Sequence, residues 1–101
     1  MTFSKISQYL LSFLVELLNI PSPTGYTEDA IAFVEKTFAD FPDISTKRTN
    51  KGALLVKWAG ISDQAPRALT AHIDTLGAVV KEIKANGRLQ ISRLGGLVLN
   101  G

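Results

Sequence analysis

The only histidine in the sequence, His72, stands two residues before an aspartate, Asp74. Both follow the short run Ala68-Leu69-Thr70-Ala71, which is typical of a buried central strand. Side chains two positions apart on a strand point to the same side, and α/β sheets bind ligands at the carboxyl ends of their strands. A metal-binding histidine usually donates its other ring N–H to a carboxylate. The spacing therefore predicts half of a metal site, with His72 as the ligand and Asp74 as the residue that orients it.

A purely structural interpretation of the same pair stays open. Five of the 101 residues are aspartates, so about one histidine in twenty would have an aspartate at this spacing by chance, and many such pairs are ordinary surface hydrogen bonds. Spacing alone does not decide between the two interpretations.

No other residues in the sequence complete such a site. Catalytic zinc needs three protein ligands and an open position, and a two-metal centre needs more. There is no cysteine. The other acidic residues considered as ligands are expected on solvated helix faces, in a polar loop or in a hairpin: Glu16, Glu28, Asp29, Glu35, Asp63 and Glu82. Serine chemistry is unsupported, because there is no Gly-x-Ser-x-Gly elbow and Ser22, in Pro-Ser-Pro, is interpreted as a turn residue.

Two helices are expected ahead of the histidine. Apolar residues recur at helical spacing over residues 3–19, on a stripe wide enough to be covered on more than one side, and Pro21 and Pro23 end this helix. Thr27 is the expected N-cap of a second helix that ends near Asp40.

Strands follow the second helix. They are expected over residues 44–49, 53–58 and 68–71, and a hairpin over 78–84 and 88–94 flanks Asn86-Gly87, a strong hairpin signal. The change of pattern near Thr75 favours a domain boundary there. The chain ends in an apolar strand, residues 97–99, with no evident partner, which indicates the N-terminal portion of a longer protein.

Composition excludes several function classes. The net charge of +2 is too small for a nucleic-acid-binding surface, and the one tight group of basic residues, Lys47, Arg48 and Lys51, is placed in a turn. The apolar stretch over residues 9–20 is interrupted by polar residues, so neither a signal peptide nor a membrane span is expected. With no cysteine, the sequence fits a cytoplasmic protein.

Four segments carry a family resemblance. Residues 17–28, Leu-Leu-Asn-Ile-Pro-Ser-Pro-Thr-Gly-Tyr-Thr-Glu, are similar to a helix followed by a Pro-Ser-x-x-Gly-Tyr-x-Glu loop. Residues 49–54 resemble an Asp-x-x-Gly-Asn-Leu turn, and residues 71–80 an Ala-His-x-Asp-x-x-Gly-x-x-Val segment. Asn86-Gly87-Arg88-Leu89 and Leu94-Gly95-Gly96 match a hairpin and a diglycine. In this order they resemble the N-terminal part of the dinuclear metalloaminopeptidases of metallopeptidase family 42, which include glutamyl and deblocking aminopeptidases and the TET particles, some labelled endoglucanase.

The resemblance implies an α/β fold in two parts. Residues 1–75 would be the N-terminal portion of an α/β zinc-peptidase domain, with two helices and strands of a mixed sheet. Residues 76–101 would be the first β-hairpin of an inserted, β-rich dimerisation domain. Thr75 departs from the glutamate that family members often have after the aspartate, and Lys51-Gly52-Ala53 departs from Leu-Gly-Asn.

The resemblance also implies an activity. His72 matches a ligand to one of two divalent metal ions, zinc or cobalt, and Asp74 matches the family's catalytic-site aspartate that orients it. The remaining ligands and the general base lie downstream in the family, so this chain is expected to bind neither metal fully and to be inactive alone. The substrates would be peptides with a free N-terminus, and the whole protein would be a homo-oligomer built from dimers, up to a dodecamer. No nucleic acid or membrane partner is implied.

Two other functions stay open. Related co-catalytic zinc dipeptidases and deacylases also use His-x-Asp, but typically with a proline soon after, where this chain has Thr75-Leu76-Gly77. Alternatively, the chain is a non-enzymatic α/β interaction module in which His72 is structural.

Overall fold

Two helices and two hairpins make up residues 2–96, the part of the chain that the computed structural model describes. Their bounds follow the order of the chain: helix α1 (Phe3–Leu18), helix α2 (Glu28–Ala39), and strands β1 (Ile44–Arg48), β2 (Leu54–Trp58), β3 (Gly77–Ile83) and β4 (Leu89–Leu94). β1 pairs with β2 and β3 with β4, both antiparallel. The expected α/β layout is confirmed, and these elements begin and end within one residue of the positions predicted from the sequence. The strand predicted over residues 97–99 lies outside the described residues.

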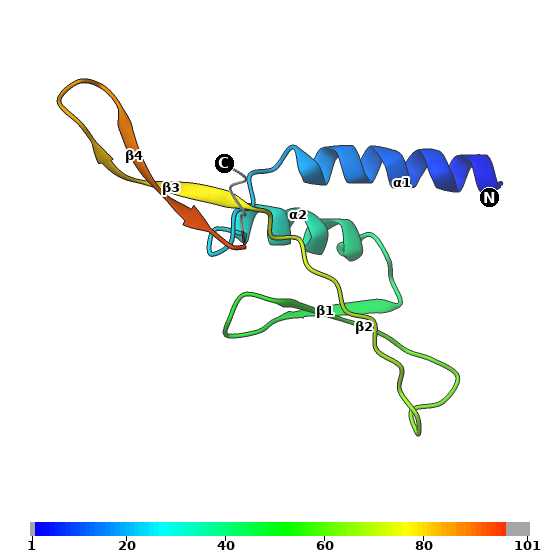
Figure 1. Cartoon of the computed structure of the whole chain (residues 1–101). Coiled ribbons are helices and arrows are strands. Elements are labelled where there is room, and N and C mark those ends of the chain that lie inside the picture. Colours follow the sequence, from blue (N-terminus) through cyan, green and yellow to red (C-terminus); the bar gives the residue numbers. More distant parts are fainter. Residues whose placement is uncertain (1, 97–101) are drawn as a thin grey trace.

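Helix α2 forms the middle layer, with α1 on one side and the β1–β2 hairpin on the other (Figure 1). On the α1 side, the ring of Phe13 stacks on Phe33 of α2, with centroids 5.4 Å apart and an interplanar angle of 27°. At the start of α2 the hydroxyl of Thr27 makes no capping hydrogen bond, although Thr27 occupies the N-cap position as expected.

On the other side of α2, an ion-pair cluster joins the helix to β1. Arg48 Nη2 lies 2.7 Å from Glu35 Oε2, and its Nη1 lies 2.8 Å from Glu28 Oε1. Hydrogen bonds to Glu35 and then to Glu28 raise the pKa of Arg48. Arg48 lies in the strand expected over residues 44–49 rather than in the turn expected for the basic group. The two glutamates hold α2 against β1 instead of only facing solvent.

Little apolar surface is buried within the described residues. Ala30 is the one buried hydrophobic residue there, and the radius of gyration is 18.4 Å, against about 13 Å for a compact domain of this length. Apolar side chains of α1 away from α2 face outward: Phe3, Leu11 and Leu18 are 87%, 62% and 65% exposed. Cover on more than one side of α1, as expected from its wide stripe, is not provided by residues 2–96.

The buried strand predicted over residues 68–71 is not formed. This segment lies in an extended connection between β2 and β3, and Leu69 is fully exposed. A strand requires hydrogen bonds to a neighbouring strand, and both sheets of the described chain are complete as two-stranded hairpins without it. The prediction of a buried strand over residues 68–71 is therefore wrong for the described chain, because no strand lies beside this run in residues 2–96.

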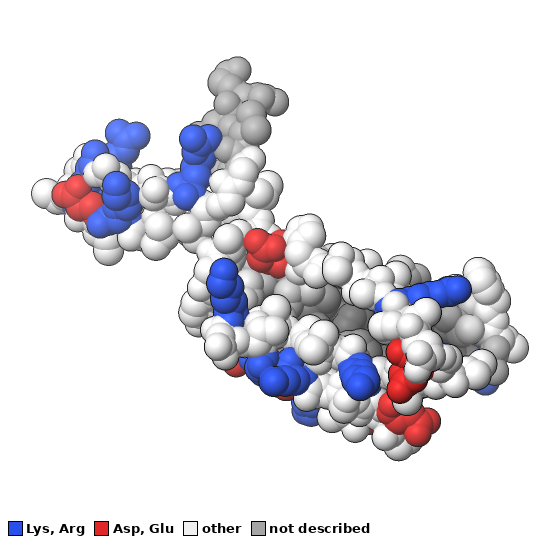
Figure 2. Space-filling model, turned by 90° about the horizontal axis from the view of Figure 1, so that it is seen from below, with Lys and Arg blue, Asp and Glu red and all other residues white. Residues whose placement is uncertain are grey.

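The β3–β4 hairpin stands away from the two helices (Figures 1 and 2). The Asn86-Gly87 pair lies in its turn, as predicted: the amide of Gly87 donates to the carbonyl of Lys84 over 2.9 Å, and Gly87 has φ +80°. A type I turn followed by a glycine in the left-handed region is a common three-residue hairpin connection. No helix in residues 2–96 is long and apolar enough to span a bilayer.

Gly77→Ala is expected to destabilise the protein. A Cβ at position 77 would lie 2.6 Å from the Cβ of Pro23, so the proline or the start of β3 must move, and overpacking of this kind costs about 1–3 kcal/mol of the free energy of unfolding. Urea unfolding measures the change. Gly60→Ala is the control, because its Cβ would meet only the backbone oxygen of Ser62, at 3.7 Å. Equal stability of the two variants would contradict the close contact between Pro23 and β3.

Candidate functional site

The loop between the two helices lies against the segment that carries His72 and Asp74. The amide of Thr75 donates to the carbonyl of Ser22 over 2.7 Å, and the amide of Thr24 donates to the carbonyl of Thr75 over 3.3 Å. These bonds form an isolated parallel bridge between Pro23 and Thr75. Two segments about fifty residues apart are thereby held side by side at the start of β3 (Figure 1).

Ser22 anchors this contact. It is 3% exposed, the one buried polar residue among residues 2–96, and its hydroxyl donates to the carbonyl of Ile73 over 3.0 Å. The loop closes behind it, where the amide of Tyr26 donates to the carbonyl of Pro23 and Gly25 adopts φ +89°. Ser22 therefore does more than the turn residue expected from Pro-Ser-Pro: it fixes the backbone directly between His72 and Asp74.

His72 and Asp74 are in direct contact. His72 Nδ1 lies 2.9 Å from Asp74 Oδ1 and 3.3 Å from the backbone oxygen of Asp74. The side chain of His72 is 86% exposed and that of Asp74 is 37% exposed. The two side chains thus point the same way, as the spacing predicts, although the segment that carries them is extended rather than part of a sheet.

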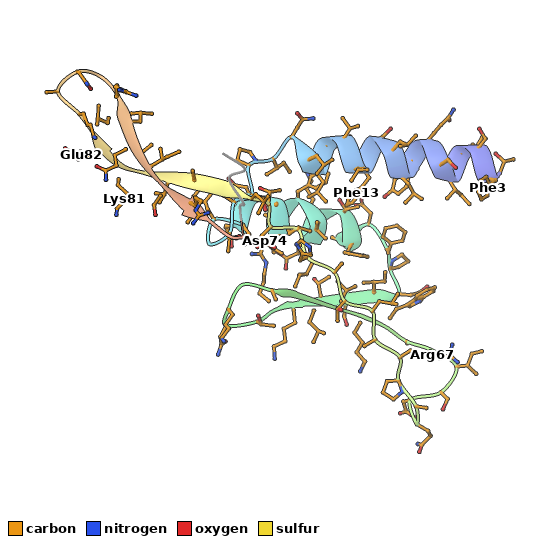
Figure 3. The ribbon with its side chains drawn as sticks, viewed as in Figure 1. Phe3, Phe13, Arg67, Asp74, Lys81 and Glu82 are labelled. Carbon is orange, nitrogen blue, oxygen red and sulfur yellow. The ribbon has the colours of Figure 1, made fainter. Side chains whose placement is uncertain are left out.

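The second oxygen of the Asp74 carboxylate also accepts a hydrogen bond. Thr24 donates its hydroxyl hydrogen to Asp74 Oδ2 over 2.8 Å. The hydrogen bond from Thr24, followed by the one from His72, lowers the pKa of Asp74 below its usual value of 3.8. Asp74 is therefore ionised at neutral pH and accepts both bonds (Figure 3 shows where it lies).

This arrangement sets the tautomer of His72. An ionised carboxylate only accepts hydrogen bonds, so the proton of a neutral His72 ring sits on Nδ1 and the lone pair on Nε2. Within the described residues only Nδ1 makes a hydrogen bond. A solvent-facing imidazole with its lone pair on Nε2 and a carboxylate behind Nδ1 is the form in which histidine binds zinc and other divalent metals.

The described residues supply one histidine nitrogen of this kind as a metal ligand, and no second ligand lies beside it. Among residues 2–96 no three His, Asp or Glu side chains come together as they would to hold a metal ion. None of the other acidic residues considered from the sequence joins His72: Glu28 and Glu35 bind Arg48 instead. These residues fit a metal site to which the chain contributes one ligand, His72, together with Asp74, which orients it.

Thr24 is the site residue that sequence reasoning missed. A threonine in a Pro-Ser-Pro-Thr-Gly loop gives no residue-type signal for a hydrogen bond to a carboxylate fifty positions later. The similarity of residues 17–28 to a family loop marks the segment but does not distinguish the threonine within it.

The carboxyl group of Asp74 is expected to titrate below 3.8 in the folded chain. A carboxyl whose pKa is lower in the folded state contributes stability above its unfolded pKa, and this contribution is lost as the pH falls through the folded value. The contact of the loop with residues 73–75 should therefore weaken in acid. The ¹³Cγ chemical shift of Asp74 measures the midpoint, with the urea-unfolded chain as the reference. A midpoint at or above that of the unfolded chain would contradict the two hydrogen bonds.

Two comparisons relate this chain to known proteins. The family model described as M42 glutamyl aminopeptidase matches residues 52–100, a span that includes His72, Asp74 and the β3–β4 hairpin. "Putative aminopeptidase YhfE" of Bacillus subtilis (strain 168) is 44% identical over 90 residues, which are 89% of this chain and 26% of that protein. The chain thus spans about a quarter of the length of the curated relative it matches. On the two matches together, the chain belongs to the M42 glutamyl aminopeptidase family.

Proposed function

We propose that a protein of the relative's length that carries this chain is a metal-dependent aminopeptidase, which removes N-terminal residues from peptides. Family membership supports the peptidase class. The observation that carries the metal dependence is the His72–Asp74 pair, in which Nδ1 is held at 2.9 Å by a carboxylate and the ring is 86% exposed. In this proposal His72 Nε2 is a ligand to one of two divalent metal ions, zinc or cobalt.

The residues of this chain prepare a ligand in three ways. Asp74 fixes the tautomer of His72, and its negative charge makes Nε2 a stronger donor. The hydrogen bonds from Ser22 and Thr75 hold the backbone around Asp74, so the ring is presented from a fixed position. The exposure of the ring leaves room for further ligands and for a peptide. When bound, two metal ions would supply an activated water and polarise the scissile carbonyl.

The same proposal assigns Asp74 a positioning role. Both of its carboxylate oxygens already accept hydrogen bonds, one from Thr24 and one from His72. A carboxylate held through both oxygens in this way orients its neighbours, which is the role the proposal gives to Asp74. The proposal assigns the general base to another residue of the whole protein.

A subunit contact is proposed for the β3–β4 hairpin. It stands apart from the helices (Figure 1), and its apolar side chains are half to three-quarters exposed, namely Val79, Val80, Ile83, Leu89 and Ile91. Exposed apolar surface on this scale is typical of an interface between proteins. The hairpin would serve a homodimer in the proposed enzyme.

Family membership favours an aminopeptidase over the two other functions considered. A dipeptidase or deacylase of the co-catalytic zinc class would be expected to match a different family model, and residues 75–77 lack the proline typical of those enzymes. A non-enzymatic module would give no reason for the carboxylate that holds His72 in a metal-binding tautomer.

His72→Ala is expected to weaken zinc binding in the whole protein by about a hundredfold or more, because loss of a ligand exceeds the 10–100-fold effect of losing its hydrogen-bond partner. Competition with a chromophoric chelator measures the affinity. Arg67→Ala is the matched control, since Arg67 is an exposed residue of the same extended segment (Figure 3). Unchanged zinc affinity in His72→Ala would contradict the proposed function.

The 101-residue chain alone is expected to show no peptidase activity, because residues 2–96 bring one ligand-bearing side chain to a reaction that needs two filled metal sites. Hydrolysis of aminoacyl-nitroanilides by the purified chain, with zinc or cobalt added, measures this. Hydrolysis that is present and then abolished by His72→Ala would show that the chain carries a complete site.

A further inference from the structure

We propose that Thr24 is a positioning residue for the metal ligand, acting through Asp74 on His72. Its hydroxyl fixes the orientation of the carboxylate so that the other oxygen holds Nδ1–H and Nε2 is left for the metal. The role of Thr24 in metal binding rests on the proposed function, whereas the hydrogen bonds from which it is inferred are present without a metal.

The three side chains form a continuous hydrogen-bonded series. Thr24 Oγ1 lies 2.8 Å from Asp74 Oδ2, and Asp74 Oδ1 lies 2.9 Å from His72 Nδ1. A carboxylate held through one oxygen alone can still rotate about its Cβ–Cγ bond, since this torsion is broad. Hydrogen bonds to both oxygens restrict that rotation and thereby fix the plane in which the imidazole lies.

Thr24 is itself fixed by its surroundings. Its amide donates to the carbonyl of Thr75, and a Cβ at Gly95 would lie 3.3 Å from its hydroxyl oxygen and 3.5 Å from Leu76 Cδ2. Gly95, which follows β4 and has φ +74°, thus comes close to the hydroxyl from the side of the hairpin. The backbone of Thr24 is therefore tied to the segment before β3, and its hydroxyl lies near the end of β4.

The hydroxyl of Thr24 is one of several bonds that dock the loop. Ser22 Oγ binds the carbonyl of Ile73, and the backbone bonds between Ser22, Thr24 and Thr75 use no side-chain atom of Thr24. Valine has the shape of threonine without the hydroxyl, so Thr24→Val keeps these contacts and releases only the carboxylate. Thr24→Ser restores the donor. This separation lets an experiment distinguish a role in positioning from a role in loop stability.

The test compares Thr24→Val and Thr24→Ser with the unmodified protein in two measurements. The first is the zinc dissociation constant of the whole protein, by chelator competition. We expect it to rise about three- to tenfold in Thr24→Val, at or below the lower end of the range for direct partners of a metal ligand, and to change less than twofold in Thr24→Ser. The second is the ¹⁵N chemical shifts of the His72 ring in the metal-free protein, at a pH where the ring is neutral. We expect Nδ1–H in the unmodified protein and in Thr24→Ser, and a mixture of tautomers in Thr24→Val.

Thr37→Val is the matched control, because its hydroxyl donates to the carbonyl of Phe33 within α2 and lies outside the site. Zinc affinity and ring shifts in Thr24→Val equal to those of the unmodified protein would overturn the proposal. An equal loss in Thr24→Val and Thr24→Ser would also overturn it, because the hydroxyl would then not be the acting group. Either result leaves His72 as a ligand, whereas failure of the proposed function requires that His72→Ala itself leave zinc affinity unchanged.

Discussion

The site depends on one contact, in which the loop over residues 22–24 pairs with residues 73–75. Two backbone hydrogen bonds and the buried hydroxyl of Ser22 hold these segments together. The segment that bears His72 belongs to neither sheet, and residues 2–96 contain little apolar core against which it could pack. Polar, directional bonds between distant parts of the chain therefore take the place of sheet hydrogen bonds in positioning the imidazole.

The second constraint is a single carboxylate that is held through both of its oxygens. Asp74 accepts from Thr24 on one oxygen and from His72 on the other, and these bonds lower its pKa below the usual value. An ionised carboxylate held beside Nδ1 disfavours the tautomer of His72 that carries its proton on Nε2, because the unprotonated Nδ1 would set a lone pair against a negative charge. Local electrostatics thus determines which nitrogen faces solvent before any metal binds.

The sequence predicts the local parts of this structure well. Pro21 and Pro23 end the first helix, the Asn86-Gly87 pair forms the hairpin turn, and His-x-Asp gives the contact at 2.9 Å, because each of these depends on residues close together in the chain. The parts that it does not predict depend on distant residues. The run over residues 68–71 is apolar enough for a strand but has no neighbour in the described chain, and nothing in the type of Thr24 or Arg48 indicates the carboxylates they bind. The division at Thr75 between two domains stays a prediction.

The central claim, that His72 Nε2 is a metal ligand held by Asp74, is tested most directly by anomalous X-ray diffraction at the zinc edge from crystals of the zinc-loaded whole protein. The account predicts a zinc peak about 2.0–2.1 Å from Nε2 of His72, with Nδ1 still bonded to Asp74. Zinc bound elsewhere while the His72 ring stays free, or zinc bound to Nδ1 with Asp74 turned away, would contradict it.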